Sequence, residues 1–363
     1  MRADVIRFDL PDPGDVSALA GAIDAGRVDP GRIVAIIGKT HGNGLVNDYT
    51  RGYLTQSLLK LLAARTGEAE AGLQARIPMV FSGGVEGVLS PHFIVFAVHD
   101  DEDAPTEPGL AVATAMTPPL GPEDLGRQRQ IDLTAAAVEE AMARADIHSP
   151  DDVHFVQVKG PAFAQADLAG AADGLASDDP GKLMGFCRAA SAIGVARALG
   201  EVPAAEANEA AVLRDFSVRS NVASCSAGLE VSCNEVIVIG MAPGWSGPLA
   251  IAHAPMADAL DVAAVHHALA GVGLAAAPQL AAGDAARLRA VFVKGEAARS
   301  GLIRGRGHTM LNDGDIDQQR HIRAALGAVV AATLGETQLF VSGGAEHQGP
   351  AGGGLVAVIA ERT

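Results

Sequence analysis

Three kinds of reactive side chain recur three times along the chain, always in the same order. Each lysine ends a short apolar run, each arginine lies on the helix-like stretch that follows, and each serine opens a Ser-x-Gly-x-Glu pattern before another apolar run. The second and third copies align without gaps from Arg188 to Gly200 and from Arg323 to Gly335. The three sets are Lys39, Arg51 and Ser82; Lys159, Arg188 and Ser226; and Lys294, Arg323 and Ser342.

These residue types favour acyl-transfer chemistry. The small residue after each serine leaves backbone N–H groups free to approach a ligand, which places a nucleophile beside an oxyanion donor. None of the eleven histidines recurs with the serines, so lysine is the predicted base. Burial and nearby arginines favour the neutral form that a lysine base needs. The arginines themselves suit carbonyl oxygens or an enolate-like anion.

The segments around these residues predict a repeated α/β unit. Its order is helix, strand ending in lysine, arginine-bearing helix, strand ending in Ser-x-Gly, and a last strand. Asp15, Asp132 and Asp261 each precede an apolar helical pattern, and aspartate favours the helix N-cap, so we expect helix starts there. The strand ends meet at one sheet edge, which is where α/β folds bind ligands. We therefore expect three divergent copies of one α/β unit around a shared site.

Two turn-rich stretches divide the chain. Residues 100–108 are charged and interrupted by proline, and residues 243–248 combine glycine with proline. These joints predict repeat units at 1–103, 104–250 and 251–363.

Composition narrows the functional class. The formal net charge is −16 and no Lys/Arg run exceeds two residues, which argues against nucleic-acid binding. No apolar run approaches the length of a membrane span, and the acidic N-terminus does not fit a signal peptide. The three cysteines form no CxxC pair, which fits a reducing compartment. We expect a cytoplasmic protein without a membrane partner.

Four longer segments resemble the cyanuric acid hydrolase and barbiturase family of ring-opening amidohydrolases. They are 38–52, 152–159, 306–313 and 341–350, and the resemblance extends over essentially the whole chain. It implies three similar units around a pseudo-threefold axis with one central active site. It also implies a small cyclic imide substrate, opening of cyanuric acid to carboxybiuret without a catalytic cofactor, and a homotetramer.

The resemblance assigns roles to the repeated residues. It implies that Ser226 is the nucleophile and Lys159 its base, and the Ser-Ala-Gly sequence of this copy, against Ser-Gly-Gly in the others, marks it as the odd one. Arg320, close to Arg323 on the same stretch, is the weaker arginine because the repeat alignment selects Arg323. The residues expected to bind substrate are Lys39, Arg51, Ser82, Gly83, Arg188, Ala227, Lys294, Arg323, Ser342 and Gly343.

A structural metal ion near the last Ser-Gly-Gly loop is also implied by the resemblance. One carboxylate with several carbonyl oxygens suits Mg²⁺ or Ca²⁺ rather than Zn²⁺. The matching positions are Glu296, Ala345, Gln348, Gly349, Pro350 and Gly353.

Three alternatives stay open at the level of sequence. Barbituric acid has the same ring shape with one N–H replaced by CH₂, so a barbiturase would carry the same residues. A non-catalytic protein could use the pocket to bind a small imide. A decayed paralogue is the third, although all nine repeated residues are intact.

Overall fold

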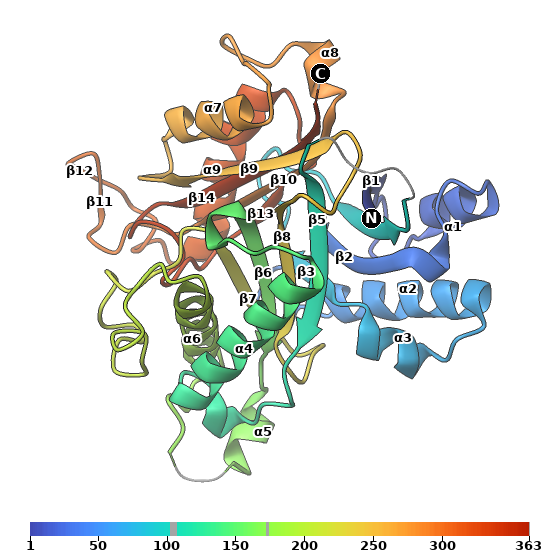
Figure 1. Cartoon of the computed structure of the whole chain (residues 1–363). Helices are drawn as coiled ribbons and strands as arrows, with labels where there is room; N and C mark the ends of the chain where they lie inside the picture. Colours follow the sequence, from blue (N-terminus) through green and yellow to red (C-terminus); the bar gives the residue numbers. More distant parts are fainter. Residues whose placement is uncertain (102–106, 172–173, 363) are drawn as a thin grey trace.

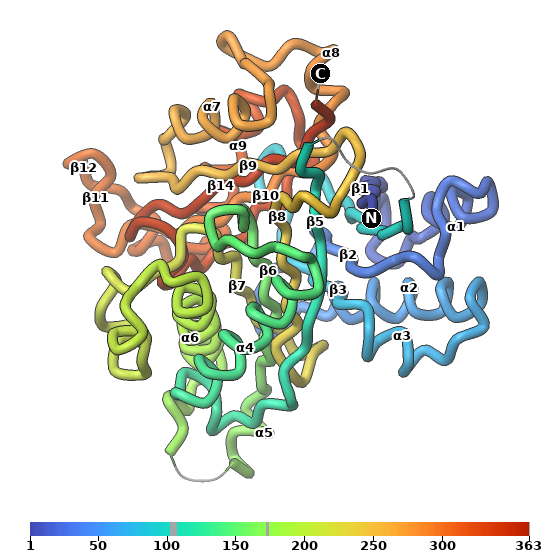
Figure 2. Tube along the Cα trace, in the orientation of Figure 1, coloured from blue at the N-terminus to red at the C-terminus, as the bar shows by residue number. Residues whose placement is uncertain are grey.

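The structure is a computed structural model that describes residues 1–101, 107–171 and 174–362. The chain folds into three α/β regions that meet at the centre of the molecule (Figure 1). In Figure 2 the blue, green-to-yellow and orange-to-red parts of the trace occupy separate regions around that centre. The expected α/β class is confirmed. No helix in the described residues is long and apolar enough to cross a membrane.

Three four-stranded sheets share one connectivity. In each, the first strand pairs with the last, the last with the second, and the second with the third, and only the second and third strands run parallel. In sheet order, the strands are β1 (Arg2–Asp9), β4 (His92–His99), β2 (Ile33–Thr40) and β3 (Met79–Gly83); β5 (Gly109–Met116), β8 (Glu235–Ala242), β6 (Val153–Pro161) and β7 (Ala223–Gly228); and β9 (Leu249–Met256), β14 (Gly354–Glu361), β10 (Leu288–Gly295) and β13 (Phe340–Ser342). A short hairpin, β11 (Leu302–Ile303) and β12 (Arg306–Gly307), stands apart.

The parallel pair of each sheet sets the lysine opposite the serine. Lys39 is in register with Ser82, Lys159 with Ser226, and Lys294 with Ser342. A register shift near the start of the lysine strand also recurs, between Ile33 and Ala35, Val153 and Phe155, and Leu288 and Ala290. We call each lysine–serine pair, with its strands and the arginine of the same copy, a wall of the site. The first wall holds Lys39 and Ser82, the second Lys159 and Ser226, and the third Lys294 and Ser342, so all three share one backbone scaffold.

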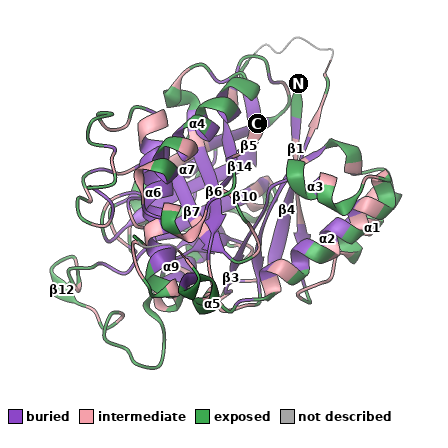
Figure 3. Cartoon of the chain, turned by 90° about the horizontal axis from the view of Figure 1, so that it is seen from below, coloured by how far each residue is buried: buried purple, intermediate pink, exposed green. Residues whose placement is uncertain are grey.

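Helices cover the outer sides of the sheets. The helices of the first region are α1 (Ser17–Asp24), α2 (Thr50–Thr66) and α3 (Glu70–Arg76); those of the second are α4 (Gln128–Arg144), α5 (Gln165–Ala169) and α6 (Pro180–Ala198); and those of the third are α7 (Val262–Gly271), α8 (Ala282–Ala285) and α9 (Gln318–Leu334). The 3₁₀ helices are η1 (Pro30–Arg32), η2 (Pro122–Asp124) and η3 (Pro150–Asp152). Figure 3 shows their outer faces exposed and the strands buried.

The predicted helix starts have mixed outcomes. Asp261 is the N-cap of α7, and its side chain accepts a hydrogen bond from Ala264 N. Asp15 accepts from Ser17 N, the first residue of α1, although Val16 holds the cap position. The expected start at Asp132 is wrong, because α4 already begins at Gln128. Asp132 instead lies on the exposed face of α4 and forms an ion pair with Arg197.

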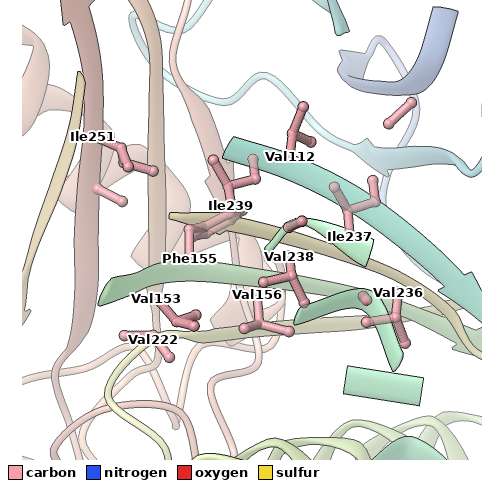
Figure 4. Packing of buried hydrophobic residues seen from close by; sticks show 14 of the residues in the cluster. Val112, Val153, Phe155, Val156, Val222, Val236, Ile237, Val238, Ile239 and Ile251 are labelled. Atoms are coloured by element: carbon pink, nitrogen blue, oxygen red, sulfur yellow. The ribbon is translucent and has the colours of Figure 1, made fainter. Parts of the chain in front are cut away.

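The apolar core joins all three sheets. Ile37, Phe155 and Phe292, one from each region, are fully buried in a single cluster. The rings of Phe155 and Phe292 stack with centroids 4.4 Å apart, a favourable aromatic geometry. Figure 4 shows part of this cluster, with Val156, Val238 and Ile239 side chains packed between strands. The strands that carry the lysines and serines are thereby held rigidly against one another.

Candidate active site

A cavity at the meeting point of the three sheets is lined by residues from all three regions. Gly44, Met184 and Gln319 join the predicted residues at its surface. Lys39 and Lys294 do not line the cavity but lie fully buried behind their serines. The predicted residues that do line it are Arg51, Ser82, Gly83, Lys159, Arg188, Ser226, Ala227, Arg323, Ser342 and Gly343.

In the first and third walls the lysine bonds its serine. Lys39 Nζ lies 3.0 Å from Ser82 Oγ and 3.3 Å from the Gly83 carbonyl oxygen. Lys294 Nζ lies 3.1 Å from Ser342 Oγ, 2.9 Å from Gly343 O and 2.6 Å from Cys225 O. A neutral amine has two N–H donors and one lone pair, so at Lys294 it can serve both carbonyls and accept the serine proton.

The second wall is arranged differently. Lys159 Nζ donates to Phe81 O at 2.9 Å and lies 2.8 Å from Glu230 Oε1. Ser226 Oγ is buried and has no hydrogen-bond partner within the described part of the chain. The hydroxyl that borders the cavity is therefore free to meet a ligand, while its lysine is held in an ion pair.

Burial lowers the pKa of all three lysines, because the charged form loses its solvation. The pKa of Lys39 falls well below its usual range, with Arg323 adding to the effect of burial. Burial and then Arg188 lower the pKa of Lys294 to about 7. Burial also lowers the pKa of Lys159, but the Glu230 carboxylate opposes it. The lowered pKa favours the neutral amine of the lysine in all three walls, and it does so least in the second.

The three arginines form a closed ring of ion pairs with the glutamates of the Ser-x-Gly-x-Glu pattern. Arg188 makes two bonds to Glu346, at 2.8 and 2.6 Å, and Arg323 makes two to Glu86, at 2.8 and 2.5 Å. Arg51 Nε lies 3.3 Å from Glu230 Oε1. Each arginine thus pairs with a glutamate of another region, so the ring ties the first to the second, the second to the third, and the third to the first.

Glu86, Glu230 and Glu346 are site residues that the sequence analysis did not assign. Their signal was present, because glutamate occupies the fifth position of the pattern in all three copies. Burial raises the pKa of Glu346, but Arg188 outweighs it and brings the pKa to about 2. The preference for Arg323 over Arg320 agrees with the geometry, since the Arg323 side chain is 3% exposed and that of Arg320 46%.

The residues of the expected metal site lie close together beside this ring. Glu296 is buried; its Oε2 lies 2.7 Å from Arg299 Nη2, and its Oε1 accepts from Gly352 N at 3.2 Å. Glu296 N donates to Gly353 O at 3.1 Å, which sets the carboxylate against the 345–353 loop. Burial raises the pKa of Glu296, so a nearby cation would favour its charged form. Within the described residues no group of three or more His, Cys, Asp or Glu side chains could hold a metal.

Comparison with known proteins agrees with this architecture. The family model described as amidohydrolase ring-opening protein matches residues 4–361. The chain belongs to this family of ring-opening amidohydrolases, which are hydrolases.

Individual relatives are similar over nearly their whole length. Cyanuric acid amidohydrolase of Ectopseudomonas oleovorans (strain CECT 5344) is 48% identical, with 99% of each chain covered. The same enzyme of Azorhizobium caulinodans is 47% identical, again over 99% of each chain. A solved structure of cyanuric acid hydrolase, described as an evolutionary innovation by structural concatenation, has a TM-score of 0.95 at 44% identity, with 99% of each chain covered.

Proposed function

We propose that this protein hydrolyses cyanuric acid to carboxybiuret at the three-walled cavity. The observation that carries the proposal is the triplicated Ser–Lys register around one cavity, together with relatives named for this activity. Cyanuric acid is a planar ring with three carbonyls in threefold array. Each wall offers a serine, the backbone after it and an arginine, so the three walls match the three carbonyls.

We assign the reaction to Ser226. Neutral Lys159 accepts the Ser226 Oγ proton as the oxygen bonds to a ring carbonyl carbon, and backbone N–H groups with an arginine stabilise the oxyanion. The C–N bond breaks, and Lys159 returns the proton to the leaving nitrogen. Water then attacks the acyl ester, its proton passes through Lys159 to Ser226 Oγ, and the opened product leaves with a new carboxyl group. The free Ser226 hydroxyl at the cavity supports this assignment.

A second assignment has one observation in its favour. In the third wall the Lys294 amine already contacts Ser342 Oγ at 3.1 Å, with a pKa brought to about 7 by burial and Arg188. That pair resembles a preassembled nucleophile and base. Separate Ser226→Ala and Ser342→Ala variants distinguish the two walls by which one loses turnover.

The substrate is tested by parallel turnover assays with cyanuric and barbituric acid. Hydrolysis of cyanuric acid, with barbituric acid acting only as an inhibitor, is the expected result. Turnover of barbituric acid alone would keep the site and reassign the protein as a barbiturase. Saturable binding of either ring without turnover would support the binding-protein alternative.

We also propose a structural Mg²⁺ or Ca²⁺ ion held by the Glu296 carboxylate, with oxygens of Ala345, Gln348, Gly349, Pro350 and Gly353 as further ligands. The buried carboxylate against this loop supports the donor set. Such an ion would brace the loop that carries Glu346. Extraction with a chelator is expected to lower the midpoint of thermal unfolding, and added Mg²⁺ or Ca²⁺ to restore it.

We propose that the protein is a cytoplasmic homotetramer, as the family resemblance suggests. Light scattering coupled to size-exclusion chromatography measures the assembly directly. A mass near that of one 36.8 kDa chain would contradict the tetramer.

A further inference from the structure

The position across the sheet from each lysine differs between the walls, although the backbone register is the same. Lys39 faces His92, Lys159 faces Glu235, and Lys294 faces Leu355 on the neighbouring antiparallel strand. Directly paired residues lie on the same sheet face within side-chain reach. Of these three cross-strand neighbours, only Glu235 carries a carboxyl group.

Glu235 is deeply enclosed. The residue is 6% exposed, and its Oε2 accepts a hydrogen bond from Met79 N of β3 at 3.2 Å. Lys159 donates to Phe81 O on that same strand. The Glu235 carboxyl and the Lys159 amine are thus both hydrogen-bonded to β3, the short strand that also carries Ser82 of the first wall.

We propose that Glu235 is a positioning residue of the reactive wall, which acts through Lys159 by controlling the charge of its amine. This inference rests on the proposed function. Burial raises the pKa of Glu235 to about 7, so the charge of this carboxyl changes near neutral pH. Its ionised form raises the pKa of Lys159, in the same direction as Glu230. Lys159 and Glu235 then titrate as a coupled pair.

The other groups around the pair do not change charge as Glu235 does. Glu230 raises the pKa of Lys159 more strongly than Glu235. Burial raises the pKa of Glu230 itself, but Lys159 and Arg51 outweigh this effect and lower it, so Glu230 stays ionised at neutral pH. The positive charge of Arg51 lowers the pKa of Lys159, opposite to the effect of a carboxylate. Burial raises the pKa of the Cys187 and Cys233 thiols to about 11, so both are uncharged near neutral pH. In the first wall, burial lowers the pKa of His92 to about 4, and the ring facing Lys39 is therefore neutral. Leu355 has no charge at all.

The test is the pH dependence of kcat in the full-length enzyme with cyanuric acid. Glu235→Gln keeps the shape and an acceptor for Met79 N but removes the charge. We expect the acid limb of kcat to move to lower pH by roughly one unit, because Lys159 loses a carboxylate that raises its pKa. KM should stay close to wild type, since the side chain lies behind the wall. Glu235→Asp keeps the charge and should leave the limb in place.

Two controls separate the possible failures. His92→Gln exchanges one neutral group for another in the first wall and should not move the limb; circular dichroism confirms that each variant is folded. If E235Q and E235D both match wild type, or shift alike, Glu235 has no charge role and the inference is overturned. If wild-type protein turns over neither ring, the proposed function itself has failed.

Discussion

The second and third walls show how one backbone scaffold can carry two different electrostatic states. Lys159 and Lys294 have the same register to their serines, and each bonds a carbonyl of another region. Yet Lys294 contacts its serine, whereas Lys159 is paired to Glu230 and leaves Ser226 free. The difference teaches that the charged side chains around each lysine, and not the strand geometry, set the state of its lysine–serine pair.

The strongest test of the difference between the second and third walls is to replace Ser226 and Ser342 separately. Ser226→Ala is expected to reduce kcat at least about 10³-fold, because the proposed nucleophile is lost. Ser342→Ala should act mainly on KM, since under the proposed assignment the third wall binds the ring without reacting. Steady-state kinetics with purified variants measures both. A larger kcat loss in S342A than in S226A would transfer the reaction to the third wall.

The glutamate of the third wall should matter for stability. Glu346→Gln removes one partner of a largely buried two-bond pair and leaves Arg188 uncompensated, a change that costs about 3–5 kcal/mol of unfolding free energy. Denaturant unfolding measures it. Glu107→Gln is the matched control, because the Glu107–Arg362 pair is exposed and should contribute no more than about 1 kcal/mol. Equal losses of unfolding free energy in E346Q and E107Q would contradict a larger contribution from the Arg188–Glu346 pair.

The same pair predicts an acid dependence. The folded pKa of Glu346 is about 2, against an ordinary value of 4.5. A depressed folded pKa stabilises the protein above the ordinary value, and this contribution is lost as pH falls from about 4.5 to about 2. Wild type should therefore lose more stability than E346Q over that range in pH-dependent thermal melts. Parallel curves would show that the ion pair does not drive acid unfolding.

The smallest change in kcat and stability is expected where the second and third walls differ only in an uncharged side chain. Cys225 precedes Ser226, whereas Val341 precedes Ser342. Burial raises the pKa of the Cys225 thiol, so it is neutral, and only its backbone oxygen meets Lys294. Cys225→Val should change kcat less than about threefold and stability by less than about 1.5 kcal/mol. A large loss of kcat would assign the thiol a role that its contacts do not indicate.

Much of the fold and site could be predicted from the repeated residues. The α/β class followed from strand and helix patterns, and the clustering of lysine with serine followed because both end strands at one sheet edge. The three glutamates could be found as the repeated fifth position of the Ser-x-Gly-x-Glu pattern. Their arginine partners could not be predicted from that pattern, because each arginine lies in another region. The start of α4 was misplaced because Gln128 begins the helix without a side-chain cap, while Asp132 further along resembles one.

The role of Glu235 could not be predicted from its own copy. In sequence it is an acid at the head of an apolar strand, a position typical of solvent exposure. Its burial comes from β3 of another region, through Met79. Long-range packing of this kind decides the charge state of a side chain, and no local pattern encodes it.

The ring of arginines and glutamates also has a consequence for co-translational folding of the enzyme. Its links join residues 158 and 237 positions apart, from Arg188 to Glu346 and from Glu86 to Arg323. A nascent chain can form its first and second sheets early, but it cannot close the ring until Arg323 and Glu346 have been synthesised. We therefore expect hydrolytic activity to appear only when the third region has folded against the other two. A partly synthesised chain should have no hydrolytic activity.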